Sequence, residues 1–166
     1  MNEKITDPAV VLKMLDDRIY AALGKNDRPV NDGMDITVLK VDETKQTVTF
    51  SGANNPLIYV KNGEIKRQRG SRSSIGGSSI LGDKKFVNHQ YEIAPGDCYY
   101  IFSDGFQDQF GGPENKKYMS GHFRSFLNEI YTLSAEEQYN RLYREFYDWK
   151  GRYNQTDDVL IIGVCF

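Results

Sequence analysis

The chain has 166 residues, 39% of them hydrophobic and 13% aromatic, so it is long enough to bury a core and too apolar for a disordered protein. Its 21 Lys and Arg residues against 23 Asp and Glu residues give a net charge of −2, which offers no electrostatic case for nucleic-acid binding. No apolar run approaches the ~20 residues that span a bilayer, and residues 1–6 lack the apolar region of a signal peptide.

The first predicted element is an amphipathic helix over residues 7–23. Thr6 supplies a capping hydroxyl, Asp7 places an acid near the positive end of the helix dipole, and Pro8 stands where no backbone bond is lost. The apolar residues recur at helical spacing, at Leu12, Leu15, Ile19 and Leu23. Gly24 is expected to end the helix.

Two antiparallel hairpins are predicted next, because the apolar residues change to the period of strands. The first combines strands at 36–41 and 48–50 around a turn at 42–45, and the second combines 57–60 and 64–69 around Asn62-Gly63. Asn-Gly is typical of a two-residue hairpin turn, since both of its residues tolerate a positive φ.

Residues 70–85 are rich in Gly and Ser, and they lack the Lys-Ser or Lys-Thr pair that a phosphate-binding loop would need. The segment is therefore predicted to be a mobile surface loop. The nearby Arg67, Arg69 and Arg72 are either a solvated charge cluster or a contact for a substrate phosphate. A strand is predicted at 86–93, followed by a turn at 94–97.

Two acidic segments adjoin the most apolar strands of the chain. Asp104-Gly105 follows a predicted strand at 99–102, and Asp157-Asp158 precedes the apolar run of the last strand, which is predicted to begin at Asp157. If these strands pair antiparallel as neighbours, the end of the first and the start of the second lie at the same edge of a sheet. Asp104, Asp157 and Asp158 would then converge, and a hard divalent cation bound by oxygen ligands is expected there.

Two helices are predicted between these acidic segments. The first contains Phe123, Phe126, Leu127 and Ile130, and the second starts at a capping box of Ser134 and Glu137 and ends at Gly151. The residues before the first of these helices, 111–117, are predicted to form a loop. The sequence therefore predicts an α+β fold with antiparallel strands and helices on the faces, in a single domain over 1–166.

Cys98 and Cys165 are both expected in strands and lack Cys-x-x-Cys spacing. Reduced core thiols, and with them a cytoplasmic location, are the interpretation that this pattern favours. Ser103 precedes an acid but has no nucleophile-elbow pattern around it, so a serine nucleophile is not expected. No catalytic residue is assigned from the sequence.

A series of short motifs runs through nearly the whole chain in a fixed order. They are Asp32-Gly33-Met34-Asp35-Ile36, Ser51-Gly52-Ala53-Asn54-Asn55-Pro56-Leu57, Ser74-Ile75-Gly76-Gly77, Pro95-Gly96-Asp97, the segment 102–112, Trp149-Lys150-Gly151 and the segment 157–163. In this order they resemble the stage II sporulation protein E-like branch of the metal-dependent (type 2C, PPM) serine/threonine protein phosphatases.

The resemblance implies a β-sandwich flanked by helices that holds two magnesium or manganese ions. By the same resemblance, a metal-activated water would hydrolyse phosphoserine or phosphothreonine on a regulatory protein, commonly an anti-sigma-factor antagonist in such relatives. By the family pattern Asp104 and Asp157 correspond to metal ligands, and Asp158 is a weaker candidate. The pattern assigns no metal role to Asp32, Asp35 or Asp108.

The chain departs from the family pattern at its start. Relatives carry a metal-bridging Asp followed by Gly-His-Gly upstream of the segment that resembles residues 6–8, whereas the single Gly-His here is Gly121-His122, in a helical pattern. The fold is therefore expected to be N-terminally incomplete, with a partial metal site and weak or absent activity. The chain would need an upstream segment or sensor, and its open sheet edges would favour self-association. The alternative is a non-catalytic binding module that retains the phosphatase fold.

Overall fold

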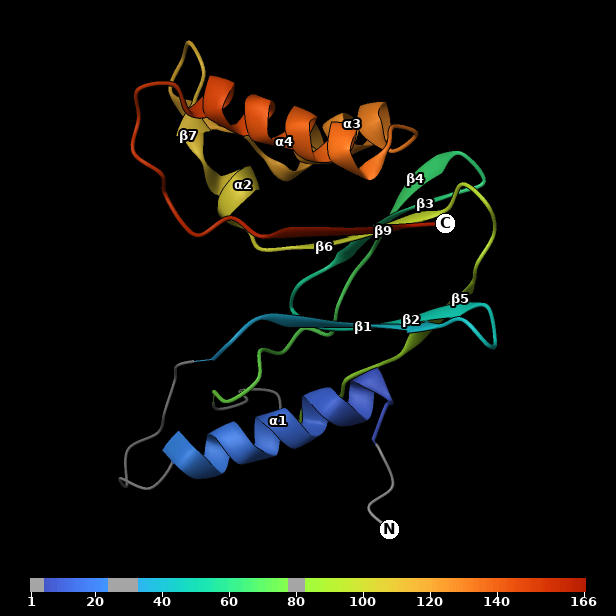
Figure 1. Ribbon diagram of the computed structural model, residues 1–166. Coiled ribbons are helices and arrows are strands. Elements are labelled where there is room, and N and C mark those ends of the chain that lie inside the picture. The colour runs from blue at the N-terminus through green and yellow to red at the C-terminus, as the bar shows by residue number, and fades with distance from the viewer. Residues whose placement is uncertain (1–4, 24–32, 78–82) are drawn as a thin grey trace. The chain divides into compact units, whose positions relative to one another are not determined.

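The computed structural model describes residues 5–23, 33–77 and 83–166, which form helices and antiparallel strands (Figure 1). The helices are α1 (Pro8–Leu23), α2 (Gly105–Asp108), α3 (Ser120–Ile130) and α4 (Ala135–Lys150). The strands are β1 (Ile36–Asp42), β2 (Thr47–Ala53), β3 (Leu57–Lys61), β4 (Glu64–Gln68), β5 (His89–Glu92), β6 (Cys98–Phe102), β7 (Phe110–Gly111), β8 (Lys116–Lys117) and β9 (Ile161–Cys165). The predicted α+β class is confirmed. Gly24, which was expected to end the first helix, and Asp32 of the first family motif lie outside the described residues.

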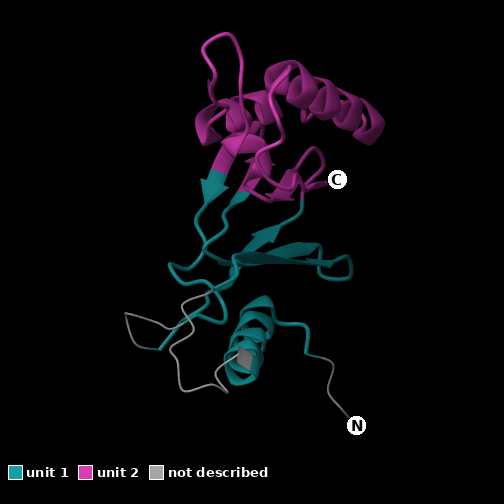
Figure 2. Ribbon diagram, turned by 90° about the vertical axis from the view of Figure 1, so that its left-hand side faces the viewer, with its two compact units in different colours: residues 1–57, 67–93 teal, residues 58–66, 94–166 magenta. Residues whose placement is uncertain are grey.

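The chain divides into two compact units, residues 1–57 with 67–93 and residues 58–66 with 94–166 (Figure 2). The first unit contains a three-stranded antiparallel sheet of order β1-β2-β5. Helix α1 lies along one face of this sheet (Figure 1), with Leu12, Ala53 and Ile75 buried in a shared apolar cluster. The helical spacing of the apolar residues in α1 therefore serves to cover the sheet.

Helix α1 is capped by a different residue from the predicted one. The Oδ1 of Asp7 accepts a hydrogen bond from the Val10 backbone N–H at 2.9 Å, so Asp7 rather than Thr6 caps the helix. The Asn88 side chain donates to the other oxygen of Asp7 at 2.7 Å. These hydrogen bonds from Asn88 and Val10 lower the pKa of Asp7.

Residues 70–77 are held in place, so the prediction of a mobile loop is wrong for this part of the segment. Ile75 is 1% exposed, and its backbone exchanges two hydrogen bonds with Met34, at 2.8 and 2.9 Å. The Ser71 N–H donates to Gly52 O at 2.7 Å, and the Gly76 N–H donates to the Asp16 carboxylate at 2.8 Å. The prediction rested on the Gly and Ser content alone. That content cannot show that distant residues such as Met34, Gly52 and Asp16 hydrogen-bond to this segment. Residues 78–82 lie outside the described part.

The second unit is built on a four-stranded antiparallel sheet of order β4-β3-β6-β9, most of which belongs to this unit. Helices α3 and α4 cover one face of it (Figure 1). The core between them is unusually aromatic, and its rings pack edge to face or tilted at 5.0–5.3 Å between centroids, a favourable arrangement. Its buried residues include Ile58, Tyr100, Phe102, Phe106, Tyr118, Phe123, Leu127 and Phe146.

Turn chemistry was predicted well in this unit, whereas the ends of strands were predicted less well. Asn62 and Gly63 adopt φ values of 54° and 75°, as the predicted hairpin between β3 and β4 requires. The predicted loop at 111–117 instead contributes to the two-residue pair β7–β8, and β9 begins at Ile161 rather than at Asp157. Such short pairings carry no apolar periodicity that could have revealed them.

The capping box predicted for α4 is confirmed. The Ser134 hydroxyl accepts from the Glu137 N–H at 3.3 Å, and the Glu137 carboxylate accepts from the Ser134 N–H at 3.0 Å. Gly151 ends the helix with a φ of 51°. Helices α1 and α4 have 16 residues each, and no helix in the described parts of the chain is long and apolar enough to cross a membrane.

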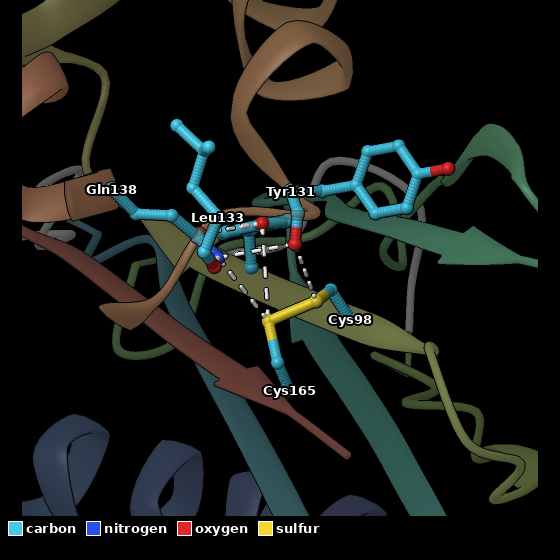
Figure 3. Close-up of a disulfide and its surroundings, with 6 residues drawn as sticks. Cys98, Tyr131, Leu133, Gln138 and Cys165 are labelled. Carbon is cyan, nitrogen blue, oxygen red and sulfur yellow. Dashed lines mark hydrogen bonds between the residues drawn. A yellow bond between two sulfur atoms is a disulfide. The ribbon is translucent and has the colours of Figure 1, made fainter. Parts of the chain in front are cut away.

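Cys98 and Cys165 form a disulfide, so the prediction of reduced core thiols is wrong (Figure 3). The two residues lie directly opposite each other on β6 and β9, with their Cα atoms 4.1 Å apart. Cys98 is buried beside Tyr131, and the Gln138 side chain donates to Cys165 Sγ at 3.8 Å. The sequence could not reveal the bond because only the register of β6 against β9 brings the two sulfur atoms together. The disulfide also removes the cysteine argument for a cytoplasmic location.

Candidate metal centre

Strands β6 and β9 are antiparallel neighbours, which is the condition that the predicted metal centre required, with Phe102 paired to Ile161 (Figure 1). Asp104 therefore follows the end of β6 at the same sheet edge where Asp157 and Asp158 precede β9. All of these residues belong to the second unit. The topology on which the predicted metal centre depends is thus present.

Ser103 extends the pairing beyond the two strands. Its N–H donates to Leu160 O at 3.0 Å, its hydroxyl donates to Asp158 O at 2.8 Å, and the same hydroxyl accepts from the Leu160 N–H at 2.9 Å. These bonds continue the ladder toward the acidic pair. The Ser103 hydroxyl therefore has a structural role, which is to join residue 103 to residues 158 and 160.

Gly105 lets the turn after β6 approach the acidic pair closely. A Cβ atom at this position would lie 2.3 Å from Asp158 O and 3.2 Å from Asp157 O. Neither carbonyl group could yield without movement of the backbone, so only glycine permits this approach. The Asp-Gly pair at the strand end thus reflects close packing as well as a turn.

The three predicted ligands, Asp104, Asp157 and Asp158, are all exposed. Asp104 stands at the start of α2, and its side chain makes no capping hydrogen bond. Asp157 turns one carboxylate oxygen, Oδ1, back to the Asp158 N–H at 2.7 Å. Across residues 5–23, 33–77 and 83–166, no three His, Cys, Asp or Glu side chains come close enough to hold a metal ion. The structure brings together the segments that carry the acids, but it does not assemble them into a closed ligand set.

The acids without a predicted metal role have other partners. Asp108 forms an ion pair with Lys117, with 3.0 Å between carboxylate oxygen and Nζ. Asp35 accepts hydrogen bonds from Asn54, at 3.1 Å, and from the Ser74 hydroxyl. The arginines Arg67, Arg69 and Arg72 are exposed.

Gln109 contacts the acidic segment and was not singled out from the sequence. Its side chain is completely buried, and it hydrogen-bonds to Asn154 and Thr156, which directly precede Asp157. From the sequence, a glutamine between Asp108 and Phe110 in a turn would be expected to face solvent. The burial of a single amide side chain produces no periodic pattern that could show otherwise.

Comparison with known proteins identifies one family for the whole chain. The model of the family described as Stage II sporulation protein E (SpoIIE) matches residues 1–166, the whole chain. A search of curated protein sequences finds no match.

Solved structures share the fold. The SiaA-PP2C domain of Pseudomonas aeruginosa is 27% identical with a TM-score of 0.81, over 96% of this chain and 60% of that one. The RsbU and RsbW domains of Rv1364c from Mycobacterium tuberculosis are 14% identical with a TM-score of 0.68, over 98% and 42% of the two chains. RsbX in complex with magnesium is 16% identical with a TM-score of 0.57, over 92% and 63%.

The chain thus spans less than two thirds of the length of each of these structures. The family model nevertheless covers every residue, and the mixed helix and antiparallel sheet architecture is that of PP2C phosphatase domains. The chain belongs to the SpoIIE family, whose structural relatives are PP2C-type phosphatase domains.

Proposed function

We propose that the chain is the C-terminal portion of a single bacterial signalling phosphatase domain that hydrolyses phosphoserine or phosphothreonine on a regulatory protein. The observation that carries the proposal is the pairing of Phe102 with Ile161 in a member of the SpoIIE family. This register sets Asp104 at the edge of the sheet that Asp157 and Asp158 also occupy, as a carboxylate metal centre between two strands requires.

The three acids would supply part of the ligand set of a site for Mg²⁺ or Mn²⁺. Asp104, Asp157 and Asp158 offer exposed carboxylate oxygens, which hard divalent ions prefer. A bound pair of ions would supply an activated water and would neutralise the phosphoryl oxygens. The acids of this chain would hold the ions and orient them at the sheet edge. The family pattern places a further bridging Asp upstream, so the chain alone is expected to bind a divalent ion weakly and to turn over little substrate.

Substitution of the proposed ligands tests the metal site. Asp104→Asn and Asp157→Asn are each expected to weaken Mn²⁺ binding at least tenfold, because each removes an anionic ligand oxygen, and Asp158→Asn is expected to weaken it less. Asp108→Asn is the matched control, since Asp108 lies on the same turn but pairs with Lys117. Free Mn²⁺ measured by electron paramagnetic resonance during titration gives the affinities.

Equal Mn²⁺ affinity in all four variants and the unmodified chain would show that the acids hold no ion. A phosphopeptide assay in Mn²⁺ provides the second readout. Rates from the isolated chain that match those of a complete PP2C domain would contradict the partial site.

The second candidate function is a non-catalytic binding module with the phosphatase fold. The observation that favours it is the lack, in the described parts of the chain, of three acidic, His or Cys side chains close enough to hold a metal. A chain that binds its regulatory protein and takes up no Mn²⁺ would support the module, whereas Mn²⁺ uptake that depends on Asp104 and Asp157 supports the phosphatase.

The proposed substrate is a phosphorylated regulatory protein of the anti-sigma-factor-antagonist kind, and the proposed location is the cytoplasm. A solved structure of similar fold is described as PppA, a key regulatory component of T6SS in Pseudomonas aeruginosa, which supports a regulatory role for this chain. An upstream sensor or N-terminal segment is part of the same proposal.

Self-association through sheet edges is the last part of the proposal. Strands β4 and β9 are the outer strands of their sheet in the described residues, and Ile162 on β9 is 44% exposed. Sedimentation velocity is expected to show dimers or larger species as the concentration rises. Ile162→Lys is expected to reduce them, because an edge lysine opposes strand pairing. A single monomeric boundary at every concentration would contradict this prediction.

A further inference from the structure

We infer that Gln109 and Ser103 are positioning residues that hold the Asp157-Asp158 segment against the turn that carries Asp104. The inference rests on the proposed metal site, because it assigns these residues a role in setting the distance between its ligands. Neither residue is proposed to touch a metal or a substrate.

Both polar atoms of the Gln109 side-chain amide form hydrogen bonds. Its Nε2 donates to Phe110 O and to Asn154 O, both at 2.9 Å, and its Oε1 accepts from the Thr156 N–H at 3.0 Å. Two carbonyl groups on one side and an N–H group on the other permit one orientation of the amide only. The side chain is 0% exposed, so these bonds are shielded from competing water.

The backbone of Gln109 is anchored as well. Its carbonyl oxygen accepts from the Trp149 Nε1–H and from the Tyr118 N–H, each at 3.0 Å. Trp149 and Tyr118 belong to the aromatic core of the second unit and contact each other edge to face at 5.2 Å. Through these bonds Gln109 links the aromatic core of the second unit to residues 154–156.

Ser103 secures the other side of the acidic pair through its bonds to Asp158 O and to the Leu160 N–H. Asp157 and Asp158 therefore lie between two anchors, Gln109 on residues 154–156 and Ser103 on residues 158–160. Both anchors come from residues 103–109, the segment that also contains Asp104. Beyond the pairing of Phe102 with Ile161, the Ser103 N–H adds one backbone bond to Leu160 O, and the side-chain bonds of Ser103 and Gln109 hold the residues on either side of the acidic pair.

Loss of an anchor is expected to act on metal affinity more than on folding. Gln109→Leu removes the three side-chain bonds at similar volume, and once the segment is released its exposed residues Asn154 and Thr156 can bond to water instead. The segment would then sample more positions, and each metal-binding event would have to restrict it again. Residues that orient metal ligands typically change affinity by about 10- to 100-fold when they are replaced.

Gln138→Leu provides the matched control in the same unit. Gln138 is also a buried glutamine, 7% exposed, whose amide donates to Tyr131 O and Leu133 O and accepts from the Tyr100 hydroxyl. It makes no hydrogen bond to residues 154–160 among those described. A loss of stability common to both variants would reflect burial of an amide, whereas an effect of Gln109→Leu alone would reflect the anchor.

The experiment measures hydrogen exchange by mass spectrometry and Mn²⁺ affinity by electron paramagnetic resonance on the full chain. Gln109→Leu is expected to raise exchange at residues 154–160 and to weaken Mn²⁺ binding tenfold or more, and Gln138→Leu is expected to do neither. Ser103→Ala is expected to behave like Gln109→Leu, and Ser103→Thr is expected to restore normal behaviour because it keeps the hydroxyl.

Unchanged exchange at residues 154–160 in Gln109→Leu would overturn the inference, and so would unchanged Mn²⁺ affinity alongside faster exchange. An unmodified chain that takes up no Mn²⁺ would overturn the proposed metal site instead. The exchange measurement would still decide whether Gln109 and Ser103 position the segment.

Discussion

Loss of the Cys98–Cys165 disulfide is expected to lower the free energy of unfolding by about 4 kcal/mol. The two cysteines are 67 residues apart in sequence, and a crosslink over a loop of this length restricts the unfolded chain by roughly that amount in the chain-entropy model. For a chain of this size the midpoint of thermal unfolding should fall by about 8–16 °C. Calorimetry of the oxidised protein and of the Cys98→Ala/Cys165→Ala variant measures the difference.

Reduction of the unmodified protein is the matched control, because it breaks the bond and retains both side chains. Cys165 is exposed, so a soluble thiol can reach the disulfide from that side. Two titratable thiols in the untreated protein, together with a melting temperature that reductant does not change, would show that the bond does not form.

Replacement of Lys84 by Met is expected to cost about 3–5 kcal/mol at neutral pH, because it leaves the Asp16 carboxylate buried without its main partner. Lys84 Nζ and Asp16 Oδ1 are 2.7 Å apart, and both side chains are 8% exposed. The carboxylate also accepts from the Gly76 N–H, so the pair links α1 to residues 70–77. Urea unfolding followed by circular dichroism gives the free energies.

The cost of Lys84→Met should depend on pH in a defined direction. Desolvation alone would raise the pKa of Asp16, but the bonds from Lys84 and Gly76 outweigh it and lower that pKa below 3.8. In the unmodified protein this contribution to stability is therefore present above pH 3.8 and is lost as the pH falls through the lowered pKa. Without Lys84 the pKa of Asp16 should rise, so the gap between the two proteins should narrow as the carboxyl is protonated.

Lys13→Met serves as the control for this prediction. Lys13 pairs with Asp17 at 2.7 Å and lies 3.7 Å from Asp16 Oδ2, so it contacts the same carboxylate from the exposed side; its side chain is 47% exposed, and the expected cost is below about 1 kcal/mol. Equal costs for Lys84→Met and Lys13→Met, or a gap that stays constant between pH 3 and 7, would contradict the structural importance of the buried pair.

Much of the fold was predictable because local chemistry specifies it. The spacing of apolar residues identified α1, and the Ser134 and Glu137 pair identified the start of α4. Asn62-Gly63 identified a hairpin, because the required positive φ values restrict which residues can occupy the turn. The limits of β9 and the β7–β8 pair were missed, since strand ends depend on which partner strand is available.

The candidate site was predictable in outline only. An acid after one apolar strand and an acidic pair before another indicated a shared edge, and the register of β6 against β9 provides it. The anchors Ser103 and Gln109 were missed as such, because their value comes from hydrogen bonds to residues 45–57 positions further along the chain. The metal role of Asp104, Asp157 and Asp158 stays a prediction.

By itself the sequence determined the α+β class, helices α1, α3 and α4, the Asn62-Gly63 turn, and the placing of the acidic residues beside two apolar runs. These features follow from the periodicity of apolar residues and from backbone preferences, which act over a few neighbouring residues. Only the tertiary structure decided the Cys98–Cys165 bond, the attachment of residues 70–77 to Asp16 and the burial of Gln109 against residues 154–156. Each of these joins segments far apart in the chain, and which groups meet there is set by packing of the whole unit rather than by local preference.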